Sequence, residues 1–459
     1  MRRTPLAQRG AAALAALHDI PAVRLEGRVA GVAGLAVDVG GLSHHLSVGD
    51  RIALRSRTGR DVPAEIIGFR NGLAQAMTYG PADGLGPGGA ALAVLPVPGA
   101  VHGATLSVSD GWIGRVIDPL GHPLDARGPL PRGPTPRPVR ASPPEATLRA
   151  RLGERLDLGV RVLNAFTTCR RGQRLGLFAA SGVGKSTLLA MLARHTACDV
   201  AVLALVGERG REVREFIEDD LGAAGLARAV VVIATSDSPP LMRREAAYAA
   251  MTVAEHFRDQ GKSELLLMDS VTRFCLSLRE IGLSAGEPPA TRGYPPSVFA
   301  ELPRLLERAG PGPELPGRPP GHITALFTVL VEGDDHDEPV ADAVRGILDG
   351  HVILDRRIGE GGRYPAVDVL RSLSRAVPGC NSEAENALTR RARAILALYA
   401  EMADLVRLGA YRAGTDPAVD EAIAVMPRLE AMLRQDRAER TSIADSFACL
   451  SGAIEGDKP

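Results

Sequence analysis

Aromatic side chains are scarce in this 459-residue sequence, at 3% of all residues. Proteins that track single-stranded nucleic acid need aromatic stacking platforms and basic grooves. An excess of basic residues does not compensate for the missing aromatic platforms, because basic and acidic side chains balance at 54 each and the formal net charge is zero. No global field of one sign recruits nucleic acid or anionic lipid. We therefore expect no specific nucleic-acid partner.

Cysteine and long apolar runs are also in short supply. The five cysteines lack C-x-x-C spacing, which argues against a zinc site or a disulfide framework and suits a reducing cytosol. No apolar run approaches the length of a membrane span. Hydrophobic residues at 45% and charged residues at 24% are ordinary for globular proteins. A chain of this length predicts two or three domains.

What the sequence does contain is a glycine-rich loop, AASGVGKST at 179–187, between the apolar runs 175–178 and 188–192. A strand, a glycine-rich turn and a helix in this order are typical of a phosphate-binding loop. The backbone N–H groups of such a turn form a positive concavity for phosphate oxygens. Lys185 would reach the β- and γ-phosphates of ATP, and the Ser186 hydroxyl would bind Mg²⁺. The predicted nucleotide-binding residues are Ser181, Gly182, Val183, Gly184, Lys185, Ser186 and Thr187.

Two acidic residues follow predicted strands of the same domain. Asp269 ends the apolar run 265–268, and Glu208 follows the run 200–206. Ligands of open α/β sheets bind at the carboxyl ends of the strands. Alone, Asp269 would most often be a helix cap, but beside a phosphate-binding loop it is predicted to hold Mg²⁺. Glu208 would orient and deprotonate the attacking water; its spacing fits equally well the start of a charged helix over 211–220.

Several long segments resemble the type III secretion ATPases, with the flagellar export ATPases nearest among them. They are GERGREV (207–213), LLLMDSVTRF (265–274), EPPATRGYPPSVFAELPRLLERAG (287–310), TVLVEGDDHDEPVADAVRGILDGH (328–351) and RYPAVDVLRSLSR (363–375). This family is itself similar to the catalytic subunits of rotary ATP synthases. The resemblance runs from about residue 22 to the C-terminus.

The resemblance implies a homohexamer that hydrolyses ATP at its subunit interfaces. It gives Glu208 the role of catalytic base and Arg209 that of a γ-phosphate contact. Tyr364 matches an adenine-stacking tyrosine, and Arg375 matches an arginine finger that reaches a neighbour's site. Without the resemblance, Tyr364 before a proline is equally typical of an extended, half-buried strand, and Arg375 of an ordinary surface arginine.

Three positions depart from the expected patterns, and none removes a catalytic group. Ala179 stands where the general loop motif has its first glycine. Ala180 replaces a glycine common in the family, which bears on loop closure, and Arg371 stands where a small residue is common.

The resemblance also implies partners and a location. The expected partners are a central stalk protein, a stator-like regulatory subunit at the N-terminal arm, export chaperone–substrate complexes and an export gate at the membrane. The protein would then be cytoplasmic and peripherally associated with the inner-membrane export apparatus.

The chain divides into four predicted segments. Residues 1–20 are predicted to form an amphipathic arm for a partner or the membrane surface, although a plain surface helix fits them equally well; their apolar core is too short for a signal sequence. Residues 21–97 contain short alternating runs between turns, which predict a small β-barrel. Residues 98–380 hold a RecA-like P-loop domain with a parallel sheet. Residues 381–459 form a helical domain, begun by a capping box at Ser382 and Glu385 and resumed at Asp416 and Ser442.

Histidines do not indicate a metal site in this sequence. His44 and His45 lie in the predicted barrel without other ligand types nearby, which favours strand residues. His336 lies among acids in the segment 332–338, which favours a solvated loop.

Four other functions remain open at this point. An injectisome ATPase of type III secretion and a rotary ATP synthase catalytic subunit share the chemistry, although the SGVGKST loop and the EGDDHDEP segment favour export. A hexameric RNA translocase also combines this core with a β-barrel, but the shortage of aromatics argues against it. A non-hydrolysing subunit would be expected to lack Lys185 or Glu208.

Overall fold

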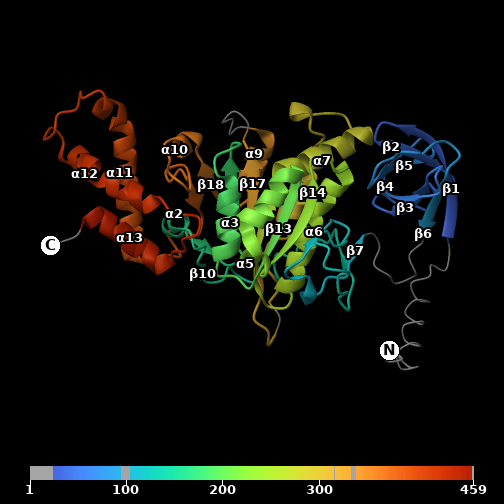
Figure 1. The fold of residues 1–459 in the computed structure, drawn as a ribbon, viewed down its shortest axis with the longest axis horizontal. Coiled ribbons are helices and arrows are strands. Elements are labelled where there is room, and N and C mark those ends of the chain that lie inside the picture. The colour runs from blue at the N-terminus through green and yellow to red at the C-terminus, as the bar shows by residue number, and fades with distance from the viewer. Residues whose placement is uncertain (1–23, 95–103, 315, 332–337, 457–459) are drawn as a thin grey trace.

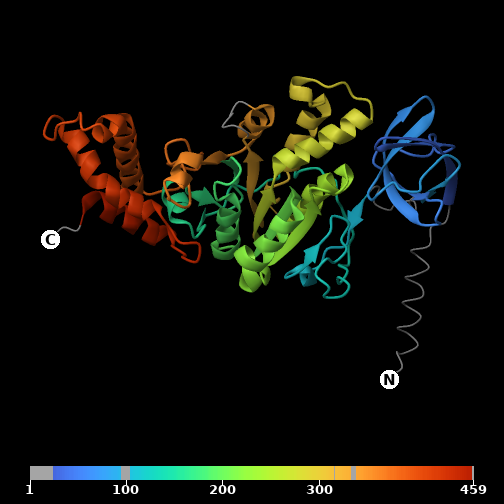
Figure 2. The ribbon, with the colours of Figure 1, turned by 45° about the horizontal axis from the view of Figure 1, so that its top comes forward.

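The structure is a computed structural model that describes residues 24–94, 104–314, 316–331 and 338–456. The predicted arm at 1–20 and His336 lie outside the described residues. Figures 1 and 2 show an elongated molecule with a barrel at one end, a helical segment at the other and an α/β core between them.

The barrel is closed and antiparallel, with strands in the order β1-β2-β5-β4-β3-β6. Alternate residues of a strand point inward, as in β3, where Ile52 and Leu54 are buried. This confirms the predicted N-terminal β-barrel. The strands are β1 (Arg24–Ala33), β2 (Ala36–Gly40), β3 (Arg51–Arg55), β4 (Asp61–Arg70), β5 (Leu73–Thr78) and β6 (Ala90–Val94).

The core contains a nine-stranded sheet in the order β19-β18-β12-β17-β15-β13-β14-β8, with β16 paired to β17. The long central strands are parallel, whereas the short β16 and β19 run antiparallel to their neighbours. β13 is buried along nearly its whole length, as expected for a strand covered on both faces. This confirms the predicted RecA-like core. The strands are β8 (Val116–Ile117), β12 (Arg174–Ala179), β13 (Val200–Glu208), β14 (Ala229–Thr235), β15 (Ser263–Asp269), β16 (Gly310–Pro311), β17 (His322–Leu330), β18 (Gly350–Leu354) and β19 (Leu373–Ser374).

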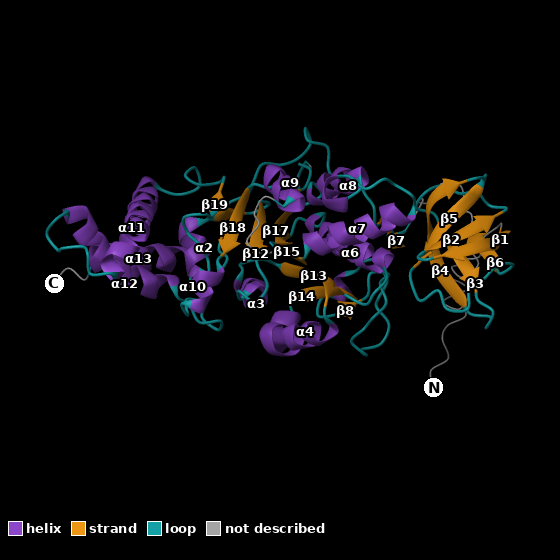
Figure 3. Ribbon diagram, turned by 90° about the horizontal axis from the view of Figure 1, so that it is seen from above, coloured by secondary structure: helices purple, strands orange, loops and turns teal. Residues whose placement is uncertain are grey.

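Helices cover both faces of this sheet (Figure 3). The apolar sides of α6, α7, α8 and α9 pack in one core cluster, and those of α2 and α3 pack in another. Short strand pairs join the connecting segments: β7 (Thr105–Leu106) with β9 (Arg137–Pro138), and β10 (Arg155–Leu156) with β11 (Cys169–Arg170). The helices are η1 (Asp110–Trp112), α2 (Arg161–Phe166), α3 (Lys185–His195), α4 (Gly210–Glu215), η2 (Phe216–Leu221), α5 (Gly222–Leu226), α6 (Pro240–Arg258), α7 (Val271–Ser284), η3 (Thr291–Gly293), α8 (Pro296–Leu306), α9 (Pro339–Ile347) and α10 (Arg356–Glu360).

The helix predicted over 211–220 differs from the observed one. α4 ends at Glu215 and continues as the π-helix η2, in which Phe216 and Leu221 are buried. The wider π turn brings these two apolar side chains, five residues apart, into the core beside α3. The charged residues between them remain toward solvent.

Three helices form the C-terminal segment: α11 (Glu383–Arg407), α12 (Pro417–Leu433) and α13 (Ile443–Glu455). The capping box predicted at Ser382 and Glu385 is present, and the Asp416 and Ser442 side chains cap the next two helices. Apolar residues of these helices belong to the same buried cluster as α2 and α3. In the described part of the chain, none of the helices combines the length and apolarity that crossing a membrane demands.

A buried ionic cluster joins the barrel to the core. The Glu65 carboxylate of β4 accepts hydrogen bonds from Arg244 of α6 and Arg140 of the connector, each at 2.6 Å, and from the Tyr79 hydroxyl at 2.5 Å. Glu245 accepts from Arg244 at 2.7 Å. The two guanidinium groups hold the pKa of Glu65 at about 2, against the burial that opposes it. The barrel is therefore linked to α6 by a cluster in which Glu65, Arg244 and Glu245 are buried and Arg140 is partly exposed.

Replacing Glu65 with glutamine should destabilise the protein by about 3 kcal/mol, because removing one partner leaves buried guanidinium charge uncompensated. Denaturant unfolding at pH 7 measures this loss. The matched control is Asp61→Asn on the same strand, which removes an exposed pair with Arg55 (2.9 Å) and should cost far less stability, because water screens the pair. Because the folded pKa of Glu65 is depressed, its contribution is complete above about pH 4.5 and declines as the pH falls toward 2. Equal losses in the two variants would contradict a buried role for Glu65.

Candidate nucleotide-binding site

The predicted phosphate-binding loop lies between β12, which ends at Ala179, and α3, which begins at Lys185. Gly182 and Gly184 adopt the left-handed region, at φ 80° and 86°, where other residues are strained. Gly184 is the N-cap of α3, and its position provides no side chain to cap the helix. The first N–H groups of α3 are thus available to an anion.

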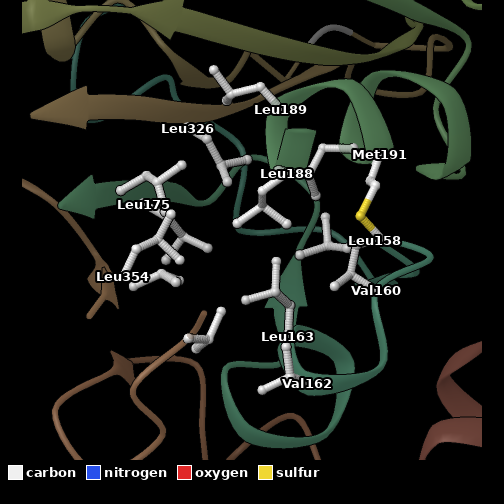
Figure 4. Packing of buried hydrophobic residues seen from close by; sticks show 14 of the residues in the cluster. Leu158, Val160, Val162, Leu163, Leu175, Leu188, Leu189, Met191, Leu326 and Leu354 are labelled. Atoms are coloured by element: carbon white, nitrogen blue, oxygen red, sulfur yellow. The ribbon is translucent and has the colours of Figure 1, made fainter. Parts of the chain in front are cut away.

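Packing beneath the loop fixes the direction of α3. Leu188 and Met191 of α3 lie against Leu158 and Val160, which precede α2, and Leu189 faces Leu326 of β17 (Figure 4). All six side chains are buried. Because a close-packed core resists displacement, the helix N-terminus is held rigidly at the end of the sheet.

Lys185, Glu208 and Asp269 converge at the carboxyl ends of β12, β13 and β15. The Lys185 Nζ atom lies 2.5 Å from Asp269 Oδ1 and 3.6 Å from Glu208 Oε1. The register explains the meeting, since Asp269 pairs with Leu205 and Glu208 lies three residues farther along β13. The three predicted residues are therefore brought together in one subunit.

Glu208 lies in a position suited to a base. Its side chain is 12% exposed, and its Oε1 atom accepts no hydrogen bond from the described residues. Burial and the neighbouring Asp269 charge raise the pKa of Glu208, while Lys185 and Arg273 oppose the rise. A raised pKa makes a carboxylate a better proton acceptor near neutral pH.

Two polar side chains of the site were missed from the sequence. Arg273 donates to the Gly207 carbonyl, and its Nη2 atom lies 3.5 Å from Glu208 Oε2. The Thr328 hydroxyl donates to Asp269 Oδ1 at 2.7 Å. Each residue could have been suspected from the sequence. Arg273 lies one helical turn beyond Asp269, and Thr328 is a polar residue within a buried apolar strand.

Tyr364 lies across the loop from the sheet. A Cβ atom on Gly184 would lie 3.1 Å from Cδ1 of the Tyr364 ring, so the ring packs directly on the loop. Beside them is a pocket of about 330 Å³, lined by Gly184, Thr187, Leu188, Met191, Tyr364, Pro365, Gln435, Asp436 and Arg437. An exposed aromatic face beside an apolar pocket is suited to stacking a planar base.

Two predicted residues do not join the cluster of Lys185, Glu208 and Asp269 in this structure. Arg209 is exposed and pairs with Glu212 at 3.0 Å. Arg375 follows β19, whose Ser374 pairs with Gly350 at the amino end of β18. Ala179 pairs with Leu354 at the other end of β18, whereas the Arg375 N–H donates to the Asp349 carbonyl, five residues before Leu354. At about 3.3 Å per residue, Arg375 therefore lies about 17 Å farther down the sheet than the end of β12.

Two of the three residues that depart from the expected sequence patterns lie at the phosphate-binding loop. Ala179 and Ala180 are buried, so both methyl groups pack in the core below the loop. Arg371 is half exposed and lies 3.7 Å from Asp355.

The residues present fit a magnesium ion. Asp269 supplies a buried carboxylate at the strand end, and Ser186 supplies an exposed hydroxyl in the first turn of α3. Carboxylate, hydroxyl, phosphate and water oxygens are the ligands that Mg²⁺ prefers. Elsewhere among the described residues, no group of three or more His, Cys, Asp or Glu side chains is arranged to hold a metal.

Comparison with known proteins gives consistent results over nearly the whole chain. Residues 159–374 match the ATP synthase alpha/beta family, nucleotide-binding domain, and residues 381–452 match the T3SS EscN ATPase C-terminal domain. A flagellum-specific ATP synthase of Caulobacter vibrioides is 53% identical, covering 97% of this chain and 99% of its own. A type 3 secretion system ATPase of Xanthomonas euvesicatoria is 45% identical, covering 94% and 95%. The assembled ATPase EscN of enteropathogenic E. coli, in complex with its central stalk EscO, superposes with a TM-score of 0.82 at 36% identity, covering 93% of this chain and all of that one.

Proposed function

Because this chain belongs to the family of flagellum-specific and type III secretion ATPases, we propose that it hydrolyses ATP at the interfaces of a hexameric ring and so energises protein export by a flagellar apparatus. The meeting of Lys185, Glu208 and Asp269 at the phosphate-binding loop carries the proposal. The greater identity to the flagellum-specific relative, 53% against 45% for the type 3 secretion relative, favours the flagellar branch over an injectisome.

Nucleotide binding would use the loop and the pocket beside it. The N–H groups of residues 181–187 and the Lys185 ammonium would hold the phosphates, and Tyr364 would stack the base. Asp269 and Ser186 would hold Mg²⁺, which neutralises phosphate charge when bound. In the structure Lys185 pairs with Asp269 and faces Glu208, so bound phosphates would draw this cation away from both carboxylates.

Hydrolysis would depend on the carboxylate of Glu208. Its Oε1 atom would accept a proton from the attacking water, and Arg273 at Oε2 would keep the carboxylate oriented. Loss of the Lys185 contact during binding would further raise the pKa of Glu208, since that cation opposes the rise. Arg209 would contact the γ-phosphate after turning away from Glu212.

The second half of each site would come from a neighbour. The distance of Arg375 from its own loop supports an arginine finger that acts in trans, meeting the charge that develops as the γ-phosphate leaves. The EscN assembly with a central stalk supports an oligomer with a stalk partner here. A stator-like subunit at residues 1–20, chaperone–substrate complexes and a membrane export gate complete the proposed partners, with the protein on the cytoplasmic side of the inner membrane.

Complementation tests the proposal directly. A strain that lacks the gene should export no filament protein, and the wild-type gene should restore filament protein to the medium. The Glu208→Gln gene should produce a folded protein that binds ATP but restores neither hydrolysis nor export, because the amide keeps the shape and removes the base. Normal motility in the deletion strain would refute the flagellar assignment.

A further inference from the structure

The connector between α12 and α13, residues 434–442, lies against the nucleotide pocket. Gln435, Asp436 and Arg437 line that pocket. The Arg437 carbonyl accepts from Arg194 Nη2 at 2.5 Å, at the far end of the phosphate-loop helix. The C-terminal helices therefore contribute one wall of the site.

Gln435 is the best-anchored residue of this connector, with an exposed fraction of 4%. Its backbone N–H donates to the Tyr364 carbonyl at 2.9 Å. Its side-chain oxygen accepts from the Arg161 N–H at 2.7 Å, and its side-chain NH₂ donates to the carbonyls of Gly159 and Glu439, both at 2.9 Å. Every hydrogen-bonding group of the side chain except one lone pair is thereby used.

The contact with Arg161 has a structural reason. Arg161 is the first residue of α2, and the preceding Val160 provides no capping side chain. An uncapped first-turn N–H costs free energy when buried, and the Gln435 oxygen supplies that cap from 274 residues away. Val160 and Leu158, on either side of Gly159, pack against Met191 (Figure 4), which also lines the pocket. Gln435 thus connects three parts of the pocket: the segment around Tyr364, the start of α2 and the α12–α13 connector.

We propose that Gln435 is a positioning residue for the nucleotide base: it holds Tyr364 and the α12–α13 connector as the two sides of the base pocket and does not touch the phosphates. This inference rests on the proposed function. Its distinctive consequence is a loss of affinity that depends on the ligand carrying a base. The phosphate loop and its carboxylates, which Gln435 does not contact, should bind phosphates as before.

The test compares two ligands on one variant. Gln435→Met, similar in volume but unable to form the side-chain hydrogen bonds, should raise the Kd of ADP about tenfold, or about 1.4 kcal/mol, in isothermal titration calorimetry. The Kd of pyrophosphate should stay within about twofold. In turnover assays the KM for ATP should rise similarly, with kcat at saturation within about twofold.

A second buried glutamine provides the matched control. Gln173 has an exposed fraction of 0%, accepts from Arg170 N–H at 3.0 Å and donates to Asp349 and Ser374, but does not line the pocket. Gln173→Met should lower the melting temperature without changing the Kd of ADP. If Gln435→Met does not fold, Gln435→Glu keeps the acceptor for Arg161 and removes both donated bonds, and the same ADP-specific loss is expected.

The outcomes separate the inference from the function on which it rests. An unchanged Kd for ADP in a folded Gln435 variant, or an equal loss for ADP and pyrophosphate, would overturn the positioning role. Wild-type protein that binds neither ligand would instead overturn the proposed nucleotide site.

Discussion

Lys185→Ala protein is expected to lose ATP turnover by about 10³-fold or more. In the proposed site Lys185 would be the cation on the β- and γ-phosphates, and removal of one preorganised electrostatic group commonly costs about 10²–10³ in rate. The loss is compounded here, since Asp269 and Glu208 both face Lys185 and would be left as neighbouring carboxylates without it. Phosphate release by purified protein at saturating ATP measures the effect.

Lys262→Ala provides the matched control for this change. Lys262 precedes β15 at the end opposite Asp269 and lies 3.7 Å from Asp110, so the same substitution removes an ion pair far from the loop. It should leave kcat within about twofold. Turnover of Lys185→Ala protein close to that of Lys262→Ala protein would remove Lys185 from the mechanism.

Arg375→Ala protein is expected to bind ATP normally and to turn it over about 10³–10⁵-fold more slowly, the range of arginine fingers. The separation of Arg375 from its own loop means that it makes no contact with nucleotide bound to the same chain. Equilibrium binding of ADP should therefore be unchanged, while turnover falls at every protein concentration. Arg371→Ala, on the same exposed segment and paired with Asp355, should keep its activity.

Mixing distinguishes a finger that acts in trans from one that acts in cis. Lys185→Ala and Arg375→Ala proteins are each expected to be inactive alone, but an interface that combines an intact loop with an intact finger would be complete. Partial turnover should return when the two are assembled together. Full activity of Arg375→Ala protein by itself would contradict the assignment.

Long apolar runs allowed the strands of the site to be predicted before the structure was known. The run 200–206 lies in β13, and the run 265–268 lies in β15. Both strands are buried along nearly their whole length, and a strand covered on both faces reads as a continuous apolar run. Because the two strands run parallel in one sheet, their register brings Glu208 and Asp269 to the same edge as Lys185. The capping box at Ser382 and Glu385 is equally local and was predicted for that reason.

Contacts between distant segments could not be predicted in the same way. The sequence indicated neither the Thr328 bond to Asp269 nor the capping of α2 by Gln435, because each joins residues that only the folded chain brings together. The helix predicted over 211–220 shows a different limit: its charge pattern suits an α-helix, but burial of Phe216 and Leu221 beside α3 selects a π turn. Tertiary packing overrode local preference there.

The phosphate loop and Arg375 lie at opposite ends of the sheet. In the proposed assembly, this separation determines how many complete nucleotide sites a given number of subunits can form. If Arg375 acts in trans as proposed, each copy would offer a loop to one neighbour and a finger to the other, so the contact would be head-to-tail. A row of n copies contains n − 1 complete sites, with one loop and one finger unused at its ends. Closing the row into a ring completes the last site without adding a subunit. Activity per subunit should therefore continue to rise after subunits first associate and level off when rings close.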